Sequence, residues 1–150
     1  MASTITVYNS LKLFLLDGTL DLNTNTFKVT LHSSAYTPNA ATHSVLAHTT
    51  GELATANGYT NGGKLLVNPS LTNSLGTVKW NADNLVWTAS SGSIVARYAV
   101  ISAIGTLNGT TNPLIAYITL NDNGGAQDVT VTDGNTLTLQ WNTNGILTLT

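Results

Sequence analysis

Polar and apolar residues alternate most clearly toward the C-terminal end of the chain. Residues 128–132 and 136–141 place Val, Leu or Trp at every second position, with Thr or another polar residue between them. Because successive side chains of a strand point to opposite faces, this alternation predicts two half-buried strands. The Asp-Gly-Asn segment 133–135 favours a hairpin between them. Residues 146–150 predict one more strand.

Two longer apolar runs precede this region. Residues 95–104 and 114–120 predict strands that are covered on both faces and that pair across the loop 105–113. Short strands separated by turn residues at intervals of about ten residues are typical of a sandwich or barrel. The fold class predicted is therefore all-β and mainly antiparallel, a β-sandwich or jelly-roll-like domain. The remaining predicted strands are 27–32, 65–67, 77–80 and 85–88.

One short helix is predicted near the N-terminus. Asn9 or Ser10 can cap the apolar segment 11–16, and the Asp-Gly pair 17–18 can end it. The alternative is a continuous apolar strand over residues 5–16, and the helix is the favoured interpretation.

The segment between the first and second predicted strands is rich in Asn, Gly and Pro. Residues 33–63 therefore read as a long loop, with a second helical turn expected at 44–48. A loop of this length in a compact domain is usually functional or makes contacts. The domain organisation expected is an N-terminal arm over residues 1–9 and a single β-sandwich domain over 10–150.

Composition narrows the possible functions. Charged residues make up 8% of the chain, the net charge is −2, and the five Lys and Arg residues are scattered singly. No basic stripe is available to neutralise phosphates, so nucleic acid is not an expected partner. The absence of cysteine excludes disulfides and thiolate metal sites. The longest apolar run is too short to span a bilayer and the N-terminus has no cationic start, so neither a membrane partner nor a signal peptide is expected.

The residues that could carry chemistry are few and dispersed. His32, His43 and His48 lack the spacing and the neighbouring carboxylates of a metal site, so we interpret them as surface or loop histidines. Most Asp residues stand beside Gly or Asn, where Asp forms turns. The sequence therefore predicts no catalytic residue, no metal and no cofactor, and a non-enzymatic protein. A hydrolase built from Asp and His residues of separate loops is a distant alternative.

The order of several short motifs resembles a known family. The motifs are 16–22 (LDGTLDL), 27–31 (FKVTL), 34–38 (SAYTP), 58–64 (GYTNGGK), 83–87 (DNLVW), 96–101 (ARYAVI), 113–117 (PLIAY) and 140–147 (QWNTNGIL). From about Leu11 to the end, the chain resembles small structural proteins encoded by tailed bacteriophages. The low charge, the abundance of Thr and Asn, and the added segment 1–9 depart from that family's pattern.

The resemblance implies a component of the virion, with capsid decoration (cement) as the favoured role. Such a protein binds the major capsid protein on the capsid exterior and stabilises the head, after its synthesis in the host cytoplasm. We expect it to act as a symmetric oligomer, such as a trimer. Its assembly contacts should rest on shape, backbone pairing and apolar burial, because the chain has few charges.

Candidate assembly contacts come from the two ends of the chain and from the long loop. The arm alternates polar with apolar residues over 2–8, and such an arm can add to the sheet of a neighbour, as can the terminal strand 146–150. Aromatic residues exposed on the loop can also bind a partner. The candidate residues are Ile5, Val7 and Tyr8 on the arm and Tyr36 and Tyr59 on the loop.

An alternative function uses the same aromatic residues differently. A tail fibre, spike or adhesin module could bind host surface glycans through Tyr36, Tyr59 or a Trp. Placement on the head or on the tail separates this alternative from capsid decoration.

Overall fold

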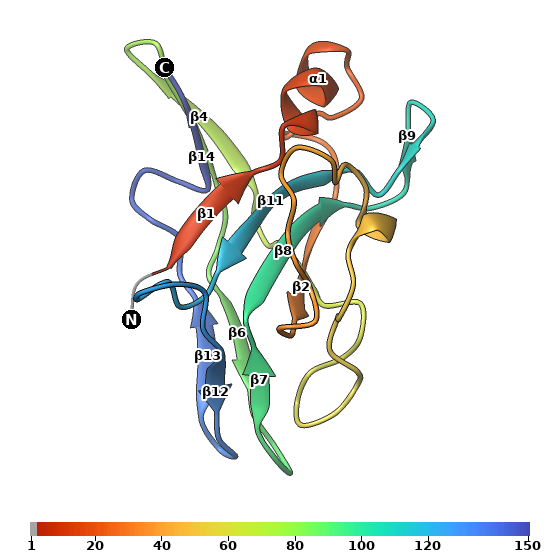
Figure 1. Ribbon diagram of the computed structural model, residues 1–150. Coiled ribbons are helices and arrows are strands. Elements are labelled where there is room, and N and C mark those ends of the chain that lie inside the picture. The colour runs from red at the N-terminus through yellow and green to blue at the C-terminus, as the bar shows by residue number, and fades with distance from the viewer. Residues whose placement is uncertain (1–2) are drawn as a thin grey trace.

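The computed structural model describes residues 3–150 and is built around a five-stranded antiparallel sheet (Figure 1). Its longest strands are almost wholly buried and carry the apolar runs of the sequence. The strand order is β1 (Thr4–Val7), β11 (Leu114–Thr119), β8 (Tyr98–Ala103), β2 (Phe27–His32) and β3 (Lys64–Leu65).

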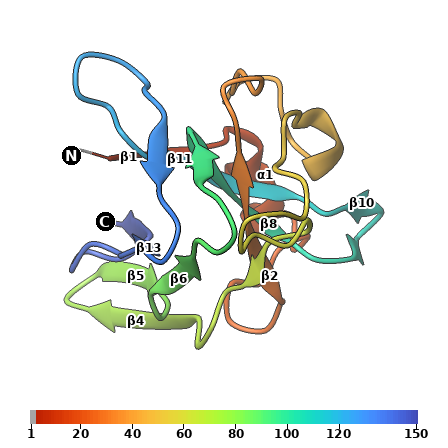
Figure 2. The same ribbon diagram turned by 90° about the horizontal axis from the view of Figure 1, so that it is seen from below.

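The remaining strands form a three-stranded sheet and three two-stranded ribbons (Figure 2). The three-stranded sheet has the order β14 (Leu147–Leu149), β5 (Thr77–Asn81) and β4 (Ser70–Ser74). The ribbons are β6 (Leu85–Thr88) with β13 (Thr136–Leu139), β7 (Ile94–Ala96) with β12 (Val129–Val131), and β9 (Thr106–Leu107) with β10 (Thr110–Thr111). All strand pairs are antiparallel, so the predicted all-β fold is confirmed.

The core fills the space between the sheets in the way that the alternating pattern predicts. Val129, Val131, Leu137 and Leu139 are buried, whereas the Thr residues between them are exposed. The Phe27 ring on β2 meets the Trp80 ring on β5 edge to face, with 4.9 Å between the ring centroids. Burial of this aromatic pair ties the five-stranded sheet to the three-stranded one.

The hairpin predicted at residues 133–135 is wrong, because β12 and β13 pair with different partners. β12 pairs with β7 and β13 pairs with β6. The bend between β12 and β13 lies against the bend between β6 and β7: the Asp133 carboxylate accepts the Ser91 N–H, and the Gly134 N–H donates to the Ala89 carbonyl. The two segments therefore change ribbons side by side, which satisfies the backbone of both bends without a hairpin.

The run 95–104 is divided by Arg97 into two strands, where the sequence predicted one. β7 ends at Ala96 and joins a ribbon, while β8 begins at Tyr98 in the main sheet. At the break, the Arg97 N–H donates to the His32 carbonyl and the Leu120 N–H donates to the Arg97 carbonyl. The run thus leaves a ribbon and enters the main sheet at Arg97. The predicted cover on both faces holds for β8, which is almost wholly buried, but not for β7, where Val95 is 41% exposed.

The predicted helix is confirmed as α1 (Ser10–Leu16), so the continuous strand over 5–16 is wrong. Asn9 has helical backbone angles and its side chain makes no capping hydrogen bond, and the Ser10 hydroxyl makes none either, so the predicted side-chain cap is also wrong. Gly18, with φ +78°, follows the helix and ends it. The turn predicted at 44–48 forms the 3₁₀ helix η1 (Leu46–His48). No helix in the described part of the chain is long and apolar enough to cross a membrane.

Candidate functional site

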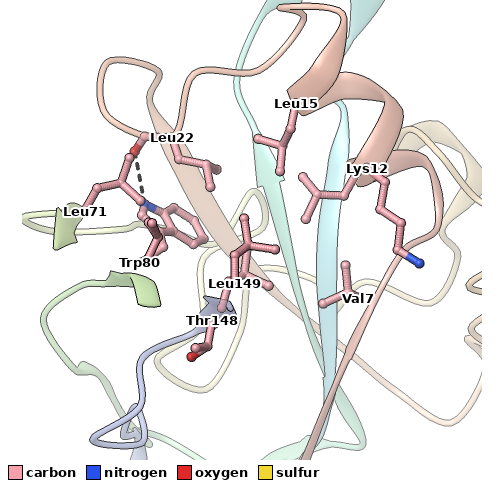
Figure 3. A pocket seen from close by; sticks show the side chains of 11 residues that line it. Val7, Lys12, Leu15, Leu22, Leu71, Trp80, Thr148 and Leu149 are labelled. Carbon is pink, nitrogen blue, oxygen red and sulfur yellow. Dashed lines mark hydrogen bonds between the residues drawn. The ribbon is translucent and has the colours of Figure 1, made fainter. Parts of the chain in front are cut away.

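An apolar groove opens between α1 and β1 on one side and the three-stranded sheet on the other (Figure 3). It has a volume of about 240 Å³. Cross-strand pairs form one wall, because Trp80 faces Leu147 and Val78 faces Leu149 across β5 and β14. The Trp80 Nε1–H donates to the Leu22 carbonyl over 3.0 Å, which fixes the indole against this wall.

The groove is only partly covered by the rest of the chain. Leu149 keeps 61% of its surface exposed and Leu71 keeps 40%, although both line the groove. Lys12 stands at the rim as the charged side chain among the lining residues. Apolar surface gathered in one groove is typical of a contact site, whereas scattered exposed leucines are ordinary.

A free strand edge runs beside the groove. Tyr8 N–H donates to the Ile115 carbonyl, and Thr6 and Thr4 face β11 in the same register. Because the inward and outward groups alternate along an antiparallel strand, the N–H and C=O groups of Ile5 and Val7 point away from β11. Within residues 3–150 no other strand pairs with this outer edge of β1, nor with the outer edge of β14. Both edges can accept a further strand.

The structure places the predicted arm in the sheet of its own chain. Residues 1–2 of the expected arm 1–9 lie outside the described residues. Ile5 and Val7 are half-buried and pack on the core, and Val7 also lines the groove. Tyr8 is completely buried, so its side chain offers no surface to a partner, and this candidate contact is corrected.

The two loop tyrosines are also buried, so the expected exposure of Tyr36 and Tyr59 is wrong. Each keeps 2% of its surface exposed, because the long loop folds back on the main sheet. The Tyr59 hydroxyl accepts the Leu31 N–H at 3.1 Å and donates to Glu52 at 2.9 Å. With their rings covered, neither tyrosine can stack on a sugar. The Trp residues that the glycan-binding alternative also offered are buried as well: Trp80, Trp87 and Trp141.

Tyr8 and Tyr36 meet in a buried chain of hydrogen bonds, whereas Tyr59 lies apart from them. Their hydroxyl oxygens are 2.6 Å apart, and the Tyr36 hydroxyl is 3.0 Å from His43 Nδ1. Burial raises the pKa of both tyrosines above the ordinary value, so both hydroxyls stay protonated. This series of hydrogen bonds joins the end of β1 to the long loop, which is a structural role.

The histidines are held by hydrogen bonds within the protein. His32 is fully buried between Thr30 Oγ1 at 2.9 Å and the Thr50 carbonyl at 2.7 Å, so its expected surface position is wrong. His43 and His48 lie on the loop with 6.1 Å between their ring centroids. Among residues 3–150, no three His, Cys, Asp or Glu side chains gather in a group that could hold a metal ion.

Asp17 and Asp21 serve as turn formers, as their positions predicted. The Asp17 carboxylate accepts the Thr19 N–H at 2.9 Å, and the Asp21 carboxylate accepts the Asn23 N–H at 2.8 Å. Hydrogen bonds from Thr19 and from the Asn23 backbone lower the pKa of these two carboxyl groups.

The groove itself was missed by the sequence reasoning. Its wall includes Leu71 on β4, a strand whose five residues are all exposed and show no burial alternation. One sequence feature that points to the groove is the segment 146–150, where Leu147 and Leu149 share a face of the predicted strand. Searches of protein-family models, of curated proteins and of solved structures found no match to the chain.

Proposed function

We propose that the chain is a non-enzymatic structural protein of a tailed-bacteriophage virion. In this role it is a capsid decoration (cement) protein that binds the major capsid protein on the exterior of the head and stabilises the shell. It acts as a symmetric oligomer, such as a trimer, and is made in the host cytoplasm. The proposal combines the motif resemblance with one structural observation, the free outer edge of β1.

The edge of β1 supplies the kind of contact that a low-charge protein can use. The outward N–H and C=O groups of Ile5 and Val7 can pair with an extended segment of the shell protein. Such backbone pairing needs no charged side chain, which fits a chain with 8% charged residues. A strand that docks on β1 also holds two proteins in one register, and this resists their separation when the shell is strained.

The experiment tests strand addition with a matched pair of variants. Purified protein is added to heads that lack it, and the bound copies and the temperature of genome release are measured. Ile5→Pro removes the outward N–H and leaves the inward bonds of Thr4 and Thr6 to β11 in place. Ile5→Thr makes a similar loss of apolar side chain but keeps the N–H.

We expect the unaltered protein and Ile5→Thr to bind the heads and to raise the temperature of genome release. Ile5→Pro should fold and bind at least about tenfold more weakly, because one outward backbone bond is lost and the added strand is displaced. Failure of the unaltered protein to bind heads, or its binding to tails or to host glycans, contradicts capsid decoration. Equal binding by the Pro and Thr variants contradicts the β1 edge as the contact.

A further inference from the structure

The hairpin of β4 and β5 carries an unusual residue at its tip. Ser74 pairs with Thr77, so the turn consists of Leu75 and Gly76. Both have positive φ, +50° and +83°, as a type I′ turn requires. This left-handed conformation costs free energy for a residue with a Cβ, and Asn tolerates it best.

Two other turns of the same chain follow the usual rule. Asn57-Gly58 and Asn108-Gly109 also have positive φ at both residues, and each closes a pair of bridged residues. Among residues 3–150, Leu75 is the one apolar side chain with a positive φ. It is also completely exposed. The backbone conformation of Leu75 therefore costs free energy, and no burial of its side chain within its own chain offsets that cost.

The groove lies on the same end of the molecule as this tip. Leu71 and Val78, on the two strands of the hairpin, line the groove a few residues from Leu75. In Figure 1 the hairpin tip projects beside the end of β14, on the side of the molecule where α1 lies. The groove volume of about 240 Å³ exceeds the ~150 Å³ that suffices for a benzene-sized group, so a leucine side chain fits.

We propose that the groove receives Leu75 of a second copy of this chain. One molecule carries both complementary parts, an exposed leucine on a projecting turn and an uncovered groove walled by leucines. The small net charge of −2 opposes the approach of two copies only weakly. The groove and the tip are different patches, so copies join tip to groove, and we propose that this head-to-tail contact closes into the symmetric oligomer rather than an open filament. The inference rests on the oligomer in the proposed function and identifies its contact.

Self-association in the absence of capsids is the first test. Sedimentation of the full chain over a range of concentrations should show a reversible oligomer. Leu75→Asn installs the residue that the other two turns use, so it should unfold at the same or a higher temperature while association weakens by about tenfold or more. Leu16→Asn is the matched control, because Leu16 is 89% exposed but does not line the groove. The self-association of this variant should equal that of the unaltered protein.

Cysteine pairs then test which surfaces meet, because the chain contains no cysteine of its own. A mixture of the Leu75→Cys and Leu149→Cys variants should form a mixed disulfide faster than a mixture of Leu75→Cys and Leu16→Cys. A monomer at every concentration, undiminished association of Leu75→Asn, or equal rates for the two mixtures would overturn the inference. If heads still bind the protein in that case, capsid decoration survives and only the tip-to-groove contact is refuted.

Discussion

Removing the Tyr36 hydroxyl should destabilise the protein about twice as much as removing the Tyr8 hydroxyl. Tyr36 stands in the middle of the buried chain, with the Tyr8 oxygen at 2.6 Å and His43 Nδ1 at 3.0 Å. In a neutral His43 whose Nδ1 accepts, Tyr36 donates to His43 and Tyr8 donates to Tyr36. Tyr8→Phe then removes one bond, at about 1 kcal/mol. Tyr36→Phe removes two bonds and leaves the Tyr8 O–H buried without its acceptor, at about 2–3 kcal/mol.

Urea unfolding of the two single variants and of the double variant measures these free energies. The double variant should cost no more than Tyr36→Phe alone, because replacing Tyr8 by Phe as well removes the buried hydroxyl that Tyr36→Phe leaves without an acceptor. A Tyr8→Phe cost equal to or greater than that of Tyr36→Phe would refute the assigned direction of the chain. Additive costs in the double variant would show that the two hydroxyls act independently.

Three further outcomes follow from the geometry. Gly63→Ala should lower the free energy of unfolding by about 2 kcal/mol or more, because a Cβ would lie 2.0 Å from the Val29 carbonyl oxygen. Gly62→Ala is the control for thermal unfolding: its Cβ meets no atom within 4 Å, and the loss should be only about 1 kcal/mol. Burial lowers the pKa of His32, so below about pH 6.5 the unfolded chain binds a proton on this residue that the folded protein does not, and the free energy of unfolding falls with pH. His32→Gln should flatten this fall in unfolding measured from about pH 7 to pH 5. Binding to heads should survive about 0.5 M salt, because the contacts do not depend on ion pairs, and binding lost at moderate salt would contradict this.

The pairing predicted between the runs 95–104 and 114–120 is confirmed, because β8 pairs with β11. The alternating pattern nearer the C-terminus, however, predicted individual strands and not their partners. Val129 and Val131 gave β12, and Leu137 and Leu139 gave β13, with the correct faces buried. The bend between them is a strong local signal for a hairpin, yet each strand pairs with a distant one. Pairing depends on where β6 and β7 lie in space, and a local pattern carries no information on that.

The candidate site is harder to predict because the position of a residue in a loop does not determine its exposure. Tyr36 and Tyr59 lie in a polar segment rich in Gly and Asn, yet both are buried under the folded loop, where their hydroxyls are hydrogen-bonded. The groove arises from the spacing between α1, β1 and the three-stranded sheet, a property of packing. Leu75 is visible in the sequence as a Leu-Gly pair, but only its φ and its exposure show that the position is unusual.

The number and position of copies on the virion test the proposed function most directly. Quantitative mass spectrometry of purified particles, combined with imaging of particles labelled on this protein, gives both quantities. We expect copies in a fixed ratio to the major capsid protein, distributed over the exterior of the head. A small number of copies confined to the tail, or no copies on the particle, would contradict it.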